Sequence, residues 1–197
     1  MLLYNSAVSG NCYKVRLLCS QLGLPLELHE LDVVDRSNRK DVIGDLNPAL
    51  RVPTLVLDDG RALVESNAII DYLAEGTPYI SNDRYERSRT LAWQFFEQYE
   101  IVPILAVARV LKLFNVEAPE AFVKEKHSAG RKGLEALERG LADNDFLVAN
   151  RYSVADISLY GYVHVAGEGG FDLTPYPAIG AWIERVAAQP GHLRITE

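Results

Sequence analysis

A chain of 197 residues can form two compact domains, and its 48% hydrophobic and 24% charged residues are typical of a folded globular protein. The net charge of −7 argues against a general nucleic-acid binder, which usually presents a concentrated basic face. The longest uncharged apolar run, residues 101–108, is far shorter than the roughly 20 residues that span a bilayer, and Met1–Tyr4 lacks the pattern of a signal peptide. We therefore expect a cytoplasmic protein with neither a membrane nor a nucleic acid as partner.

Strand and helix patterns alternate along the first 75 residues. Val15, Leu18, Cys19 and Leu22 recur at the spacing of one helix face, and residues 26–31 alternate apolar with polar side chains as a strand does. The expected elements are a strand at 2–4, a helix at 12–22 that ends at Gly23, a strand at 26–31, a short helix at 39–46, strands at 52–57 and 62–64, and a helix that begins at Ser66. This order predicts an α/β domain with a mixed sheet.

Only helical periodicity follows the break at Thr77-Pro78. We expect helices at 85–113, from Pro119 to 141, at 154–165 and at 178–188, and we expect Pro103 to kink or split the first of them. The resulting division is an α/β domain at 1–76, a linker at 77–83 and an all-helical domain at 84–197.

The two cysteines and the histidines give no sign of a disulfide or a metal site. Cys12 and Cys19 lie seven residues apart on an expected helix, or roughly 10 Å along its axis. A disulfide needs Cα atoms within about 7 Å, so we expect two free thiols, which fit a reducing compartment. His164 and Glu168 lie four residues apart, but two ligands do not make a metal site, and no metal is expected.

Two helix starts carry residues suited to binding an anion. Ser9 stands where the first strand turns into the first helix, where free N–H groups and the helix dipole favour negative charge. A hydroxyl there can donate a hydrogen bond to a thiolate and lower the pKa of the thiol, or it can simply cap the helix. Ser66 opens another helix in the same way. Ser153 and Asp156 form a capping-box pattern, for which we expect a structural role only.

Several short motifs occur in a fixed order along the chain. They are SGNCYKVRL at 9–17, VP at 52–53, ES at 65–66, FFEQY at 95–99, VAR at 107–109, SVADI at 153–157 and EGGFDLTPYP at 168–177. Together they resemble the bacterial cytosolic glutathione S-transferases over essentially the whole chain. The resemblance implies a thioredoxin-like N-terminal domain (βαβ-α-ββα) followed by an all-α helical-bundle domain. It also implies glutathione as co-substrate, a small hydrophobic electrophile as second substrate, and a function in detoxification.

The resemblance assigns the sulfur of glutathione to the start of the first helix. Ser9 falls at the catalytic position of the serine-type classes, with Asn11 and Cys12 as further glutathione contacts. Cys12 is also the alternative nucleophile, although cysteine-type members place their cysteine one residue earlier, where Asn11 stands. Cys19 is expected in the core.

The rest of glutathione is assigned to two further motifs. The Val52-Pro53 peptide bond is expected to be cis, so that the backbone of Val52 can pair with the cysteinyl residue of glutathione. Glu65 is expected to bind the γ-glutamyl ammonium and Ser66 the neighbouring carboxylate. An ordinary trans proline and a simple helix cap are the alternatives that the residues alone leave open.

The remaining assignments concern the glycine carboxylate of glutathione, the electrophile pocket and a partner chain. For the glycine carboxylate we prefer Lys40, with Arg39 and Arg51 as alternatives. For the electrophile pocket the candidates are Tyr99, Arg109 and His164. The aromatic residues of the first long helix, namely Trp93, Phe95, Phe96 and Tyr99, exceed the need of one core, and the family pairs such helices across a two-fold axis, so we expect a homodimer.

Three alternative functions remain open within this fold. A glutathione-dependent isomerase usually has a serine and a cysteine where Gly10 and Asn11 stand here. A thiol-disulfide or peroxide reductase would use Cys12 or the Ser9/Asn11 pair. A non-catalytic binding module would not need an intact glutathione site.

Overall fold

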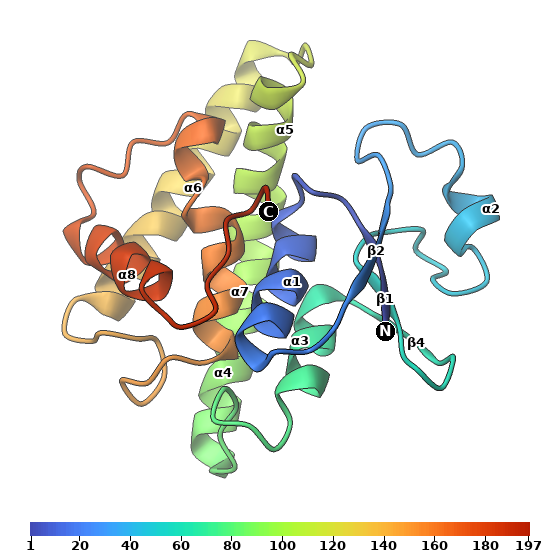
Figure 1. The fold of residues 1–197 in the computed structure, drawn as a ribbon. Coiled ribbons are helices and arrows are strands. Elements are labelled where there is room, and N and C mark those ends of the chain that lie inside the picture. Colours follow the sequence, from blue (N-terminus) through green and yellow to red (C-terminus); the bar gives the residue numbers. More distant parts are fainter. The chain divides into compact units, whose positions relative to one another are not determined.

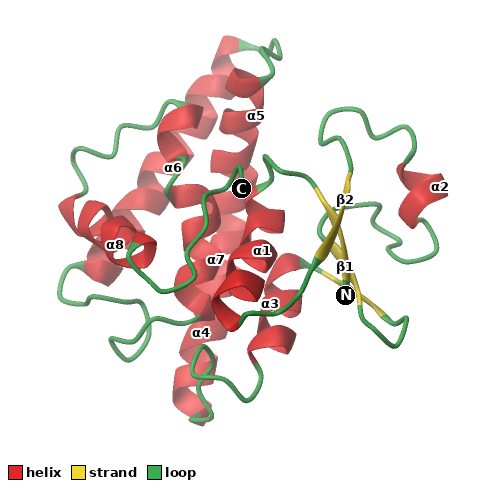
Figure 2. Cartoon of the chain, in the orientation of Figure 1, coloured by secondary structure: helices red, strands yellow, loops and turns green.

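The computed structural model describes residues 1–197, which form two compact units (Figure 1). The first unit contains residues 1–77 together with 190–197, and the second contains residues 78–189. All four strands of the sheet belong to the first unit, and the second unit is built from helices (Figure 2). This architecture confirms the expected fold, a thioredoxin-like unit followed by an all-helical one.

The sheet of the first unit is mixed. Its strands are β1 (Leu2–Asn5), β2 (Glu27–Glu30), β3 (Thr54–Val56) and β4 (Ala62–Val64), in the spatial order β2-β1-β3-β4. β1 runs parallel to β2 and antiparallel to β3, while β3 and β4 form an antiparallel hairpin. Leu3 lies opposite Leu28 on one side and Leu55 on the other, so the central strands bring apolar side chains into register.

Three helices accompany this sheet. α1 (Gly10–Leu22) and α3 (Ser66–Ala74) lie on one side of it, and the short α2 (Arg39–Ile43) lies on the other (Figure 1). The core between the sheet and helices α1 and α3 is formed by fully buried apolar side chains of both layers. They are Leu3, Leu17, Leu18, Leu55, Ile69 and Ile70. As predicted, α1 ends at Gly23, whose φ of 65° belongs to the left-handed region that favours glycine. Because α1 and α3 pack on the same side of the sheet, their N-terminal ends lie on that side as well.

The second unit consists of consecutive helices. They are α4 (Arg84–Phe96), the π-helical segment η1 (Glu97–Ala106), α5 (Val107–Leu113), α6 (Glu120–Leu141), α7 (Val154–Val163), the 3-10 turn η2 (Ala166–Gly169) and α8 (Pro177–Ala187). None of the helices has the combination of length and apolar composition needed to cross a bilayer.

Pro103 lies inside η1 and does not interrupt the helix with a loop. A proline lacks the N–H of an α-helical hydrogen bond, and its ring clashes with the carbonyl four residues earlier. A π-helical turn is wider because its hydrogen bonds reach five residues back. The α-helix is thus disturbed around Pro103, where a widened π-helical stretch separates α4 from α5.

The capping box before α7 is present as predicted. The side chain of Ser153 accepts a hydrogen bond from the backbone of α7, and Asp156 Oδ2 accepts the N–H of Ser153 at 3.0 Å. Asp156 Oδ1 also accepts the N–H of Leu147 and the indole N–H of Trp182, each at 3.0 Å. The buried carboxyl of Asp156 thus connects the loop before α7 to α8, a link that the local motif does not reveal.

The last eight residues pack with the first unit, whereas the sequence predicts a helical domain that extends to residue 197. Tyr13 Oη donates to the carbonyl of Leu193 at 2.8 Å, and Ser20 Oγ donates to the carbonyl of Gly191 at 2.8 Å. Arg16 donates to two further carbonyls of the tail. Polar side chains of α1 therefore hold residues 190–197.

Candidate functional site

Ser9 is the N-cap of α1. Its Oγ accepts the N–H of Cys12 at 3.3 Å, and its own N–H donates to the carbonyl of Ser6 at 2.9 Å. The hydroxyl of Ser9 also interacts with the buried sulfur of Cys12, and it opposes the rise in the pKa of that thiol. Since one hydroxyl can accept and donate at once, the capping bond leaves Ser9 able to donate to a ligand at the positive end of the helix.

The loop before Ser9 is held by two opposite charges. The N–H of Ala7 donates to Glu30 Oε2 at 3.0 Å, and its carbonyl accepts from Arg16 Nη2 at 3.1 Å. Glu30, at the end of β2, also contacts the amide of Asn5. Neither Arg16 nor Glu30 is among the residues predicted from the sequence, where the only signal is a charged Arg16 within the apolar pattern of α1. We call this arrangement the Ala7 clamp.

The side chain of Cys12 is fully buried in the core, and Cys19 on the same helix is buried as well. Burial raises the pKa of the Cys12 thiol to about 11, although the hydrogen bond with Ser9 acts in the opposite direction. The side chain of Cys12 is therefore shielded by the core, and the expected contact of Cys12 with glutathione stays a prediction. Cys12 takes part in this region through its backbone N–H.

Asn11 and Ser66 are brought together by a buried lysine. Lys14, which is fully buried, donates from Nζ to Asn11 Oδ1 at 2.9 Å and to Ser66 Oγ at 3.2 Å. Ser66 Oγ in turn donates to Asn11 Oδ1 at 3.3 Å, and Asn67 Oδ1 lies 3.5 Å from the ammonium. The starts of α1 and α3 thus share one polar network, which we call the Lys14 network.

Glu65 has an uncommon backbone conformation. It precedes α3 with a φ of 67°. Positive φ values are unfavourable for any residue other than glycine, because the Cβ atom crowds the backbone. The carbonyl of Glu65 accepts the N–H of Ile69 at 2.9 Å, while its side chain is exposed. The carboxylate of Glu65 is therefore open to a cationic group next to Ser66.

The Val52-Pro53 peptide bond is cis, as expected. It precedes β3, and the carbonyl of the preceding residue, Arg51, accepts from Asn47 Nδ2 and Thr54 Oγ1 at 2.9 Å each. The N–H and carbonyl of Val52 have no partner within the protein. An extended ligand can accordingly pair with the backbone of Val52.

Of the three basic candidates for the glycine carboxylate, the structure removes one. Arg39 is buried and donates to the carbonyl of Leu50 at 3.0 Å and to that of Asp32 at 2.7 Å. Its guanidinium therefore supports the loops around α2. Lys40 and Arg51 are exposed and remain candidates.

The three candidates for the electrophile pocket are differently placed. Tyr99 is 80% exposed, whereas Arg109 is buried and forms an ion pair with Glu168 at 2.7 Å. His164 stacks on Tyr160 with ring centroids 4.3 Å apart. Arg109 and His164 thus have roles within the helical unit, and their contact with a substrate stays a prediction.

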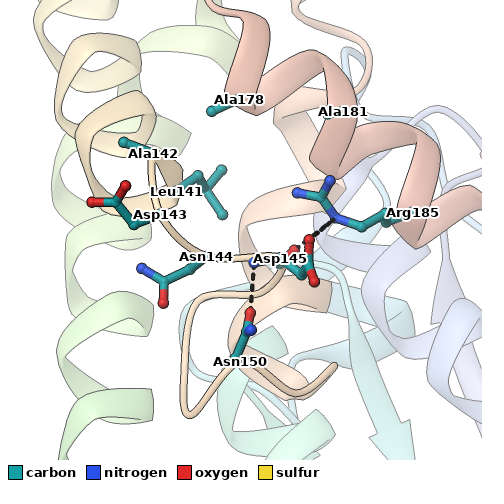
Figure 3. Close-up of a pocket in the computed structure, with 9 residues that line it drawn as sticks. All are labelled: Leu141, Ala142, Asp143, Asn144, Asp145, Asn150, Ala178, Ala181 and Arg185. Atoms are coloured by element: carbon teal, nitrogen blue, oxygen red, sulfur yellow. Dashed lines mark hydrogen bonds and ion pairs between the residues drawn. The ribbon is translucent and has the colours of Figure 1, made fainter.

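A pocket of about 270 Å³ lies in the second unit, between the end of α6 and α8 (Figure 3). Arg185 Nε donates to the carbonyl of Asp145 at 3.0 Å at its edge, and Asn150 Oδ1 accepts the N–H of Asp145 at 2.6 Å. None of the predicted site residues lines it. No three His, Cys, Asp or Glu side chains of the chain gather as metal ligands would.

Comparison with known proteins decides the family. Residues 3–79 match the glutathione S-transferase N-terminal domain, and residues 90–190 match the glutathione S-transferase C-terminal domain. The chain belongs to the glutathione S-transferase family. Glutathione is the co-substrate of such transferases, and the N-terminal match contains Ser9, the Lys14 network and Glu65.

The transferase is similar to solved and curated proteins along its whole length. A glutathione S-transferase from Pseudomonas fluorescens Pf-5 shares 41% identity, with a TM-score of 0.95 and coverage of 100% of this chain and 98% of that one. Glutathione S-transferase 2 of Anopheles gambiae is 31% identical, covering 93% of this chain and 88% of the relative. The disulfide-bond oxidoreductase YfcG of Escherichia coli K12 is 28% identical, covering 93% and 89%.

Proposed function

We propose that this transferase forms glutathione thiolate beside Ser9 and adds it to a small hydrophobic electrophile. The observation that carries the proposal is the position of the Ser9 hydroxyl, which caps α1 through its oxygen and can donate its hydrogen at the same helix end. An ordinary thiol has a pKa near 8.5 and is mostly protonated at neutral pH. A hydrogen bond donated to the sulfur, together with the helix dipole, favours the thiolate.

The chemistry then needs little more than positioning. The sulfur lone pair attacks the electrophilic carbon, a bond from sulfur to carbon forms, and the leaving group departs with the electron pair of the bond that breaks. In an addition, that pair instead moves onto the electrophile and is protonated. Ser9 stays protonated throughout, because it acts only as a hydrogen-bond donor. Stabilising the thiolate and fixing its direction are the contributions of the protein.

The remainder of glutathione fits the groups around Ser9. We propose that the backbone of Val52 pairs with the cysteinyl residue, that the backbone N–H of Ser66 at the start of α3 binds the γ-glutamyl carboxylate, and that Glu65 binds the ammonium. The open backbone groups of Val52 and the exposed carboxylate of Glu65 support these assignments. Lys40 remains the proposed partner of the glycine carboxylate, and it is exposed on α2.

We further propose that the enzyme acts as a cytoplasmic homodimer. The two free thiols fit a reducing compartment. Leu91, Phe95 and Tyr99 recur every four residues on the first long helix, and all three are exposed. Such an apolar face is suited to a second copy of the chain.

Disulfide reduction is the second candidate function, favoured by the similarity to a disulfide-bond oxidoreductase. Here the glutathione thiolate would attack a disulfide sulfur, form a mixed disulfide and release the other sulfur as a thiolate. A second glutathione would then resolve the mixed disulfide. Because Cys12 is buried, we assign this reaction also to the sulfur held by Ser9.

The deciding experiment replaces Ser9 by alanine. We expect Ser9→Ala to reduce turnover by about 10²-fold, as loss of one donor to a developing anion does elsewhere. Hydrogen bonds to charged groups contribute about 1.5–3 kcal/mol, so the pKa of the bound thiol should rise by about 1 to 2 pH units. The ultraviolet absorbance of the thiolate, followed against pH, measures this directly.

The matched control is Ser20→Ala, which removes another serine of α1 whose hydroxyl serves the tail. Both variants should be assayed with electrophiles and with mixed disulfides, which also separates the two candidate functions. If Ser9→Ala conjugates and reduces as fast as Ser20→Ala at neutral pH, the proposed function is wrong.

A further inference from the structure

The Lys14 network contains one side chain whose orientation matters for chemistry. Asn11 has a carbonyl oxygen that accepts and an NH₂ group that donates, and the two ends have nearly the same shape. Lys14 is fully buried, and its ammonium can only donate. The end of the Asn11 amide that faces Lys14 at 2.9 Å must therefore be Oδ1.

A second donor supports the same orientation. The Ser66 hydroxyl donates to Asn11 Oδ1 at 3.3 Å while accepting from Lys14 at 3.2 Å. With its oxygen occupied twice, the Asn11 amide directs its NH₂ group away from Lys14. That NH₂ group has no acceptor within the protein, and Asn11 is only partly buried. The structure therefore leaves two oriented N–H hydrogens in the first turn of α1.

We propose that Lys14 is a positioning residue that sets the Asn11 amide so that its Nδ2 donates a second hydrogen bond to the glutathione sulfur. The inference rests on the proposed function, because it needs the sulfur to lie beside Ser9. Ser9 is the N-cap of α1 and Asn11 is two residues further on, so both side chains belong to the same helix end. A turned amide would present its oxygen to the thiolate and repel it.

The same lysine connects two parts of the ligand site. Its bonds fix the side chain of Asn11, which we propose to contact the sulfur, and that of Ser66, whose backbone we propose to bind the γ-glutamyl carboxylate. A loss of Lys14 should therefore change both the pKa of the bound thiol and the KM for glutathione. A residue that only filled the core would change stability without a specific effect on the thiol.

The first test is a double-mutant cycle. Lys14→Met removes the donors at similar length, and it is measured in the wild-type protein and in Asn11→Ala, with the pKa of bound glutathione thiol as readout. We expect Lys14→Met to raise that pKa by about 0.5 to 1 pH unit in the wild type, as loss of one net hydrogen bond predicts. In Asn11→Ala, where no amide remains to orient, the same change should have less than half that effect. Equal shifts in both backgrounds would overturn the inference.

The second test does not depend on Lys14→Met folding. Asn11→Asp keeps an oxygen for Lys14 and Ser66 but replaces the NH₂ group by a negative oxygen, so we expect unchanged or higher thermal stability and a higher thiol pKa. Lys14→Arg keeps a cation that only donates, and we expect a thiol pKa closer to wild type than that of Lys14→Met. An unchanged thiol pKa in Asn11→Asp would show that Nδ2 does not contact the sulfur.

These outcomes are separable from those for Ser9. If Ser9→Ala raises the thiol pKa and Asn11→Asp does not, the proposed function stands and the role of Lys14 falls. If neither variant changes the thiol pKa, the sulfur does not lie at this helix end, and both proposals fall together.

Discussion

At the residue scale, the geometry of Ser9 allows it to cap α1 and also to play the role that we propose for it. The oxygen of Ser9 accepts the N–H of Cys12, which is the ordinary function of an N-cap. The same hydroxyl can donate its hydrogen to a ligand while its oxygen accepts. The two interpretations that the sequence leaves open for Ser9 are therefore not exclusive, and its replacement should affect helix stability as well as the thiol.

For Cys12, in contrast to Ser9, we predict that a substitution leaves the activity intact. Its buried thiol has a pKa near 11, so it is almost wholly protonated at neutral pH and is not a nucleophile. We expect Cys12→Ala to retain both conjugation and disulfide reduction, and to lower the free energy of unfolding by about 1–3 kcal/mol because it leaves a small cavity. Enzyme assays and urea unfolding measure the two effects. Loss of disulfide reduction in a folded Cys12→Ala protein would restore Cys12 as the nucleophile.

Asp156 gives a pH-dependent prediction. Burial raises the pKa of its carboxyl to about 6, against an ordinary value of 3.8, although four hydrogen bonds act to lower it. The folded chain therefore holds this proton more tightly than the unfolded chain, and stability from this group is lost as the pH rises from about 4 to about 6. The free energy of unfolding of the wild type minus that of Asp156→Asn should fall by up to roughly 3 kcal/mol across this window.

Urea unfolding of both proteins at a series of pH values measures this difference, and the comparison cancels the other carboxylates. A difference that stays level or grows with pH would contradict the raised pKa. The absolute stability of Asp156→Asn should be lower at pH 4–5 than that of the wild type, because an amide cannot reproduce every bond that Asp156 accepts.

The residue scale also shows what the sequence could and could not predict. Ser9, Ser66 and the Ser153–Asp156 box were predicted because a helix start is a local signal. The roles of Lys14 and Arg16 were missed, because Ser66 lies 52 residues from Lys14 and Ile195 lies 179 residues from Arg16. Whether Cys12 faces the core or a ligand could not be decided from the sequence for a related reason, since its burial depends on the packing of the whole unit.

At the element scale, α6 packs closely through its glycines. A Cβ at Gly130 would lie 2.3 Å from Cε1 of Phe171, a ring that stacks on His127. In contrast, no heavy atom lies within 4 Å of a Cβ at Gly180 in α8. We expect Gly180→Ala to stabilise the protein by about 0.5–1 kcal/mol through helix propensity, and Gly130→Ala to destabilise it by about 1–3 kcal/mol through overpacking.

Chemical unfolding of the two variants tests this pair, and each serves as the control for the other. Both replace a helical glycine by alanine, so propensity alone predicts the same sign. If Gly130→Ala is as stable as Gly180→Ala, the contact between α6 and Phe171 is looser than the structure shows.

The elements themselves were largely predictable, because apolar spacing and helix-ending residues such as Gly23 are local. Pro103 was the main exception. Its sequence position correctly signals a disturbed helix, but whether the chain breaks, kinks or widens depends on the neighbours of η1. The short turn η2 was likewise missed, since four residues carry no periodicity.

At the scale of the whole molecule, the exposed face of the first long helix predicts association. Phe95 is 70% exposed and Tyr99 is 80% exposed. Because they lie four residues apart on one helix face, they form a contiguous exposed aromatic patch, which is unusual on the surface of a monomer. We expect the wild type to sediment as a dimer and the double variant Phe95→Ser, Tyr99→Ser to have a dissociation constant raised by about 100-fold or more. The control is Val34→Ser, which removes an exposed apolar side chain of the first unit. A wild type that is monomeric at micromolar concentration would refute the homodimer.

The order of an α/β unit and a helical unit was predictable from the change of periodicity after residue 77. The assignment of residues 190–197 was not, because the tail is recognised by polar groups of α1 that lie some 180 residues earlier in the chain. No local pattern carries such information.

The Ala7 clamp has a consequence for the energetics of ligand capture. Arg16 and Glu30 restrain both polar groups of one peptide, so the segment leading to Ser9 has its shape before any ligand arrives. A preorganised binding site loses little conformational entropy when the ligand binds, so more of the interaction energy contributes to the affinity. Loosening the restraint through Glu30→Gln should therefore make glutathione binding entropically costlier while leaving the groups that touch the tripeptide intact, and titration calorimetry would report the difference.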